Sequence, residues 1–249
     1  MAKKVGFPEQ FYIGGYDLSG DVGSLERCSS PVAMFDVTAI DKSAVERLQG
    51  LADGQIAFNT WFNDVASQEH VALKGLVTTD RPVLWALGSA RGDVAAMLVA
   101  KQMDYAFNRG EDGSLALSSE CLGASGVALE YGEMITAGKI THASAASSAS
   151  YDNGASSANG LAAMLQLVSL ATGTVTVAVH ESSDDGVGDP FAAKATFTAV
   201  AAASAPTSER ITATGTVERY LRITTTGTFT TAVFAVGVRR GTAQDRVAY

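Results

Sequence analysis

Apolar and polar residues alternate along much of this chain with a period of two. Around residue 58, Ile56, Phe58 and Phe62 lie on one side, whereas Gln55 and Asn59 lie on the other. Such alternation is typical of a strand with one buried face. Similar runs, separated by turns rich in Gly, Asp and Ser, predict strands at 11–18, 31–37, 83–87, 94–107, 114–121, 127–135, 161–170, 174–180, 195–200, 217–224 and 229–238. We therefore expect a mainly β protein with two β-sandwich or barrel domains.

One segment of the first half departs from this period. Asp41 can cap a helix whose apolar face carries Val45, Leu48 and Leu51, and the glycines that follow would end it. We expect this to be the one short helix, in the N-terminal domain. Residues 63–80, by contrast, are polar and irregular, and they predict a long connection.

A stretch of small and polar residues divides the chain. Residues 141–160 contain little besides Ala, Ser, Gly and Asn, so they bury too little apolar surface to offset the entropy of ordering them. We interpret them as an Ala/Ser-rich linker, either a flexible tether or a surface loop. This predicts a β-sandwich or barrel domain at 1–140 and a jelly-roll or immunoglobulin-like β-sandwich at 161–249. Within the latter, 161–170 fits a helix or a buried strand, and we favour the strand.

Charge narrows the function classes. The 249-residue chain has a formal net charge of −8, and residues 1–140 hold 18 acidic against 11 basic residues. An acidic surface disfavours tight nucleic-acid binding, although an acidic wall that repels nucleic acid fits this charge. No apolar run reaches the roughly 20 residues of a membrane span. The basic start of the chain is followed by no apolar stretch, so we expect no secretory signal and synthesis in the cytoplasm.

Residues that could carry chemistry are isolated. His70, His142 and His180 have no partner at metal-ligand spacing, so we expect surface residues. Cys28 and Cys121 are far apart, and we expect two buried small side chains rather than a disulfide between early and late strands. No nucleophile elbow or phosphate loop occurs. We expect no enzyme, no catalytic residues and no cofactor.

Two further groups of residues have a structural and a binding interpretation. Asp184, Asp185 and Asp189 surround glycines and could hold Ca²⁺, but their spacing is not that of an EF-hand loop and Asp-Gly is common turn chemistry. We therefore expect no metal.

The dispersed aromatic residues could stack on sugars, although such residues are more often core or interface anchors. They are Tyr12, Tyr16, Trp61 and Trp85.

Three segments resemble the major tail tube proteins of long-tailed bacteriophages. They are YIGGYDLSGDVGSLE at 12–26, the segment 38–63 that contains LADGQIAFNTWFN, and VAKQMDYAFNRGEDGSLALSSECLG at 99–123. The segment RYLRITTTGTFTTAVFAVGVRR at 219–240 resembles small jelly-roll or immunoglobulin-like modules of virion proteins. The first resemblance covers roughly the first 135 residues and consists of a pattern of elements rather than one diagnostic motif.

This resemblance implies a structural virion protein that self-assembles. Copies would form rings, six per ring, that stack into a tail tube, with an acidic bore through which DNA passes without specific binding. Two tube domains per chain would instead imply three copies per ring. The implied partners are copies of the chain and other phage tail proteins, the implied location is the virion tail, and the second half would be an outward decoration.

Elementary sheet physics makes the same assembly feasible, because an edge strand exposes backbone groups that a neighbouring copy can bind. We expect residues 63–80 and 1–11 to be the connections that become ordered on assembly. The candidates for the lumen-facing side are Gln102, Asp104, Ser114, Ser118 and Glu120. The candidates for contact between subunits are Phe11, Tyr12, Trp61, Asn63, Asp64, Glu69 and His70. The same polar positions also fit an ordinary solvated sheet face.

The alternative function is a carbohydrate- or receptor-binding accessory protein of the virion, with the second module carrying the function. An enzyme is a more distant alternative, which would require residues among His70, His142, His180, Asp184 and Asp189 to converge in one pocket.

Overall fold

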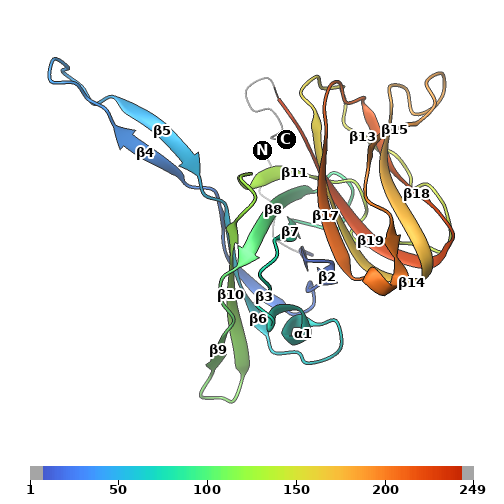
Figure 1. Ribbon diagram of the computed structural model, residues 1–249, viewed down its shortest axis with the longest axis horizontal. Coiled ribbons are helices and arrows are strands. Elements are labelled where there is room, and N and C mark those ends of the chain that lie inside the picture. Colours follow the sequence, from blue (N-terminus) through green and yellow to red (C-terminus); the bar gives the residue numbers. More distant parts are fainter. Residues whose placement is uncertain (1–7, 243–249) are drawn as a thin grey trace.

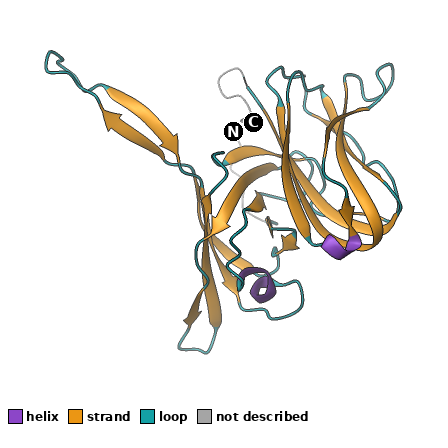
Figure 2. Cartoon of the chain, in the orientation of Figure 1, coloured by secondary structure: helices purple, strands orange, loops and turns teal. Residues whose placement is uncertain are grey.

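The computed structural model describes residues 8–242, which form two β-rich halves packed side by side, with a hairpin that projects from the first half (Figure 1). Strands dominate, and helix is confined to two short turns (Figure 2). The elements of the first half are β1 (Gln10–Ile13), β2 (Tyr16–Asp17), β3 (Val22–Ser29), β4 (Val32–Asp36), β5 (Arg47–Ala52), β6 (Gln55–Trp61), α1 (Glu69–Leu73), β7 (Arg81–Ala86), β8 (Val94–Gln102), β9 (Ala106–Arg109), β10 (Leu115–Gly123) and β11 (Glu130–Met134). Those of the second half are β12 (Ile140–His142), β13 (Tyr151–Asp152), β14 (Leu161–Ser182), β15 (Ala192–Thr196), β16 (Val200–Ala201), the 3₁₀ turn η1 (Ala202–Ser204), β17 (Thr207–Ala213), β18 (Tyr220–Thr226) and β19 (Phe229–Arg240). The predicted mainly β class is confirmed, and the sheets remain open rather than closing into barrels.

The first half folds as two antiparallel layers. One layer runs β2–β1–β7–β8–β11, and the other runs β3–β6–β10–β9. Side chains that alternate inward fill the space between the layers, and the Phe11 and Phe58 rings lie 4.5 Å apart between their centroids. The two layers join where the end of β10 pairs with the end of β8.

The second half is organised around β14. Its first part pairs with β17 and β19, and its second part pairs with β15, β16 and β18. The chain changes sheet near Gly173, whose φ of +81° lies in the left-handed region that glycine tolerates best. One strand therefore contributes to both layers of a sandwich, and the predicted strands at 161–170 and 174–180 are parts of it.

The two halves share a core and pair through their backbones. β11 of the first half pairs with β19 of the second, and Met97 and Met134 pack in one buried cluster with Met164 and Ala235. The fully buried Gln166 adds two hydrogen bonds across this seam. Its Oε1 accepts from the Gly15 backbone N–H at 2.8 Å, and its Nε2 donates to the Pro82 carbonyl at 2.9 Å.

A buried charge network crosses the same seam. The carboxylate of Glu130 on β11 accepts hydrogen bonds from Arg210 Nε at 2.7 Å, Arg210 Nη2 at 2.9 Å and Arg239 Nη1 at 3.1 Å. Glu130 is 3% exposed, and the arginines come from β17 and β19 of the second half. Charge-assisted bonds of this kind hold the two halves in one orientation.

The predicted helix after Asp41 is wrong. Residues 47–52 instead form β5, which pairs with β4 in a separate two-stranded hairpin. The turn is fastened by Thr38, whose Oγ1 accepts from the Glu46 backbone N–H at 2.9 Å. Val45, Leu48 and Leu51 do not form a buried face: all three are exposed, and within residues 8–242 β4 and β5 pair only with each other. The helix of the first half is α1, inside the segment predicted to be an irregular connection.

Residues 141–160 lie along the second half as an ordered surface segment. Ser148 N–H donates to the Ile223 carbonyl at 2.8 Å, and β13 pairs with β18. Of the two interpretations, tether or surface loop, the surface loop describes these contacts. β3 lies between the strands predicted at 11–18 and 31–37, where the sequence pattern predicts no strand, and it pairs with β6. The boundaries at 140 and 161 stay a prediction.

Candidate assembly surface

The β3–β6–β10–β9 layer has two unpaired edges. Among the described strands, β3 pairs with β6 alone, and β9 pairs with β10 alone. β3 is eight residues long, and all four residues of β9 are exposed. Backbone N–H and C=O groups along these outer sides are therefore available to a strand of another molecule.

The outward face of this layer is polar. Ser118 and Glu120 on β10 lie opposite Asn59 and Ala57 on β6, whereas Leu117 of β10 points into the core. The alternation predicted for this strand is correct. It separates a solvated face from the apolar face that packs against β7 and β8.

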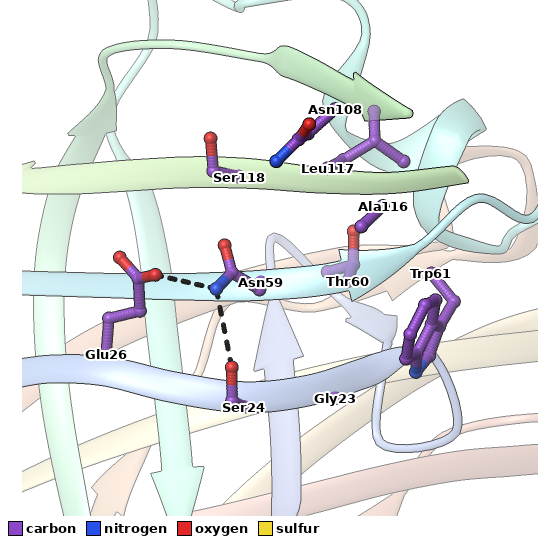
Figure 3. A pocket seen from close by; sticks show the side chains of 10 residues that line it. All are labelled: Gly23, Ser24, Glu26, Asn59, Thr60, Trp61, Asn108, Ala116, Leu117 and Ser118. Carbon is purple, nitrogen blue, oxygen red and sulfur yellow. Dashed lines mark hydrogen bonds between the residues drawn. The ribbon is translucent and has the colours of Figure 1, made fainter. Parts of the chain in front are cut away.

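A shallow groove of about 480 Å³ runs across this face (Figure 3). Asn59 lies at its centre, where Nδ2 donates to Glu26 Oε1 at 2.6 Å and to Ser24 Oγ at 3.4 Å. The groove is lined by Gly23, Ser24, Glu26, Asn59, Thr60, Trp61, Asn108, Ala116, Leu117 and Ser118. It offers amide, hydroxyl and carboxylate groups, but no nucleophile paired with a base.

Trp61 forms one end of the groove. Its indole packs against Gly23, where an added Cβ would lie 2.9 Å from Trp61 Nε1, so a larger residue at this position would displace the ring. The side chain stays 56% exposed. Of the four aromatic residues weighed as sugar contacts, Tyr12 is fully buried, and Trp61 is the exposed one at this groove.

The five predicted lumen-facing residues separate into different environments. Ser118 and Glu120 lie on the polar face, and Ser114 lies in the turn before β10. Asp104 is exposed, and its Oδ1 accepts from the Glu120 backbone N–H at 2.7 Å. Gln102 does not fit a lumen-facing position, because its side chain is buried and its Nε2 donates to the Leu73 carbonyl at 2.9 Å. The end of β8 is covered by α1, so this position faces the interior.

The seven predicted subunit contacts also divide by burial. Trp61, Asn63, Asp64 and His70 are at least partly accessible. Phe11, Tyr12 and Glu69 are buried within the chain, which leaves them no surface to offer a neighbouring copy. Their burial follows from tertiary packing, because β1 is covered on both faces, with Phe11 in the core of the first half and Tyr12 in the cluster shared with the second half, and because α1 folds back on the sheet.

The β4–β5 hairpin is a surface that the sequence did not identify. It projects away from both halves (Figure 1) and exposes apolar side chains on both of its strands. Phe35 and Leu48 are cross-strand partners and are 58% and 59% exposed. The exposed apolar residues of the hairpin are Met34, Phe35, Val37, Ile40, Val45, Leu48 and Leu51. The available signal was the set of large apolar residues spread through 32–51 among polar and charged ones.

The histidines and aspartates considered as metal ligands or catalytic groups do not come together in one site. His142 is buried, which corrects the surface expectation, and its Nδ1 lies 2.8 Å from Thr225 Oγ1. His70 lies on α1 rather than in a loop, with Nδ1 2.6 Å from the Tyr105 hydroxyl. Within residues 8–242, no group of three or more His, Cys, Asp or Glu residues is placed to hold a metal ion.

The Asp184 loop is held together by its own backbone. The Asp184 carboxylate accepts from the backbone N–H groups of Val187, Gly188 and Asp189 at 2.6–3.2 Å. These bonds lower the pKa of Asp184. The carboxylate therefore stabilises the predicted turn.

The cysteines are free thiols. Cys28 and Cys121 both lie opposite Ile56, on the two strands that flank β6, and no disulfide joins them. Burial raises the pKa of Cys121 to about 12.

In the part of the chain that the structure describes, no helix is long and apolar enough to cross a bilayer.

Comparisons with known proteins give weak likenesses. No family model and no curated protein matches the chain. One similar solved structure is the Dit protein of phage SPP1, described as a paradigm of the hub adsorption apparatus in phages that infect Gram-positive bacteria; it has 10% identity and a TM-score of 0.35, and covers 95% of this chain and 100% of that one. Another is the baseplate of phage p2 in its activated conformation with strontium, with 9% identity, a TM-score of 0.32, and coverage of 93% and 98%. Likenesses of this size do not establish a family.

Proposed function

We propose that this chain is a non-enzymatic structural subunit of a phage tail, and that identical copies join into rings of six that stack into a tube. The observation that carries this proposal is the β3–β6–β10–β9 layer, which ends in two unpaired edges. Pairing of β9 of one copy with β3 of the next would satisfy both edges and continue the sheet. Such a contact is heterologous, so repeating it closes a ring when the rotation between copies allows closure.

The β4–β5 hairpin supports stacking of such rings. A two-stranded hairpin without packing is only marginally stable in water. This one exposes apolar side chains along 32–51 and has no partner surface within the described chain. A neighbouring ring that covers the hairpin would bury these side chains and stabilise it.

The polar face supports the role of a conduit. It carries the carboxylates of Glu26 and Glu120, and residues 1–140 hold the acidic excess of the chain. A wall of this charge repels phosphates, so DNA would pass without specific binding. In this arrangement the second half lies outside the bore as a decoration, other tail proteins contact the ends of the tube, and the protein resides in the virion tail.

Negative-stain electron microscopy and light scattering of the purified chain test this proposal. We expect stacked rings or tubes for the wild type and unstacked rings for the double variant Phe35→Ser/Leu48→Ser, because the hairpin loses the apolar side chains that a neighbouring ring would cover. Lys42→Ser is the matched control on the same hairpin, since it removes only an exposed ion pair with Glu46. A wild type that stays monomeric at high concentration would contradict self-assembly, and stacking that survives in the double variant would contradict the role of the hairpin.

A second candidate function is carbohydrate binding by a virion accessory protein, and the groove favours it. An exposed indole beside amide, hydroxyl and carboxylate groups can stack on a sugar ring and bind its hydroxyls. The groove lies in the first half, whereas the sequence placed this function in the second module. A glycan array with wild type and Trp61→Ala tests this candidate, with Phe35→Ser as control. Binding lost only in Trp61→Ala would support it, and no binding by the wild type would exclude it.

A further inference from the structure

The short helix α1 is fastened to the sheet at its C-terminal end. Arg81 Nη1 donates to the Ala72 carbonyl at 2.8 Å, and Gln102 Nε2 donates to the Leu73 carbonyl at 2.9 Å. Leu73 itself is fully buried in the core of the first half. The end of α1 is therefore held by both hydrogen bonds and apolar packing.

The N-terminal end of α1 is held differently. Glu69 is 0% exposed, and neither carboxyl oxygen has a hydrogen-bond partner among the described residues. The neighbouring Thr60 hydroxyl is also buried without a partner. Burying an ionised carboxylate without partners costs several kcal/mol, so this site favours the protonated acid.

The groups around Glu69 add no compensating charge. Asp21, from the turn before β3, accepts from the Glu69 backbone N–H at 3.1 Å and brings a second carboxyl close. Tyr105, which precedes β9, lies with its hydroxyl near the Glu69 carboxyl and 2.6 Å from Nδ1 of His70 on the same helix. Arg81 binds the opposite end of α1 and forms no ion pair with Glu69. Burial first, and then Asp21, raise the pKa of Glu69, although the nearby amide and hydroxyl groups lower it in part.

Strained residues flank this helix. Ser67 has a φ of +66° and Leu76 has a φ of +38°, both in the left-handed region that costs energy for residues other than glycine. The segment between them also exposes Val71, and Val65 lies exposed just before it. A segment that is strained at both ends and holds a buried acid gains little from staying docked once that acid is charged.

We propose that residues 63–77 form a proton-operated latch. While Glu69 is protonated, α1 stays docked on the sheet. Loss of the proton makes release of the segment favourable, because the carboxylate reaches water and the backbone relaxes at Ser67 and Leu76. Release also separates His70 from Tyr105 and so takes apart the aromatic cluster that these residues form with Phe62 and Phe107.

Hydrogen exchange of residues 63–77 in the full chain tests the latch. After correction for intrinsic exchange, protection of the α1 amides should fall by up to tenfold per pH unit between the ordinary Glu pKa of about 4.3 and the raised pKa of docked Glu69, because opening releases one proton in that range. Glu69→Gln should keep α1 protected and abolish this slope. Asp64→Asn is the matched control, since it neutralises an exposed carboxyl of the same segment and should keep the wild-type slope.

Three outcomes would overturn the latch. They are a slope that survives in Glu69→Gln, a slope that disappears in Asp64→Asn, and protection in the wild type that does not change with pH. If Glu69→Gln does not fold, carbon-13 NMR of the wild-type carboxyl groups replaces it. One Glu should titrate above the ordinary range as α1 protection is lost, and titration of every Glu in that range would refute the proposal.

Discussion

Removal of the carboxylate that joins the halves should destabilise the whole chain. In Glu130→Ala, the guanidinium groups of Arg210 and Arg239 lose their carboxylate partner, and three charge-assisted hydrogen bonds of 2.7–3.1 Å disappear. Breaking a buried ion pair from one side costs about 3–5 kcal/mol. The side chains of Arg210 and Arg239 are 12% and 11% exposed and have further interactions, so we expect the lower end, about 3 kcal/mol.

Thermal and urea unfolding measure this effect. For a chain of this size, about 3 kcal/mol lowers Tm by roughly 6–12 °C. Asp152→Ala is the matched control, because it breaks a bidentate pair with Arg219 that is exposed and lies within the second half. This control should change Tm little. Equal effects of the two substitutions would refute the argument that burial at the seam makes the Glu130 network stabilising.

Three further changes test other parts of the structure. Gly15→Ala should destabilise the fold by about 2 kcal/mol or more, because φ at this position is +88° and the new Cβ collides with the β17 backbone. The control Gly126→Ala, at φ +74°, adds backbone strain without a collision. Equal losses of unfolding free energy in urea would contradict the collision. Burial lowers the pKa of His142. Its contribution to stability is therefore complete above the unfolded pKa of about 6.5 and is lost as pH falls toward the folded pKa. His142→Gln should flatten this part of the stability–pH curve, and an unchanged curve would refute the role of His142. A thiol reagent should modify the half-buried Cys28 first and Cys121 only on unfolding, and equal rates in the native protein would show that Cys121 is not protected.

The sequence by itself determined the local β structure. Period-two alternation at 55–62 and 114–121 identified β6 and β10 and separated their polar face from their buried face, because a strand sends successive side chains to opposite sides. The strand predicted at 11–18 contains β1 and β2, which a turn at Gly14 and Gly15 joins. Local patterns of this kind need only neighbouring residues.

Tertiary structure decided the elements whose environment lies far away in the chain. Val45, Leu48 and Leu51 fit a helical face, but a helix is stabilised by packing, and the part of the chain that the structure describes provides no core beside them. Gln102 and Glu69 are polar in sequence, and they are buried because α1 docks on β8. The Glu130–Arg210–Arg239 network joins residues about 80 to 110 positions apart. No local pattern encodes such contacts, because they depend on which surfaces of the two halves meet.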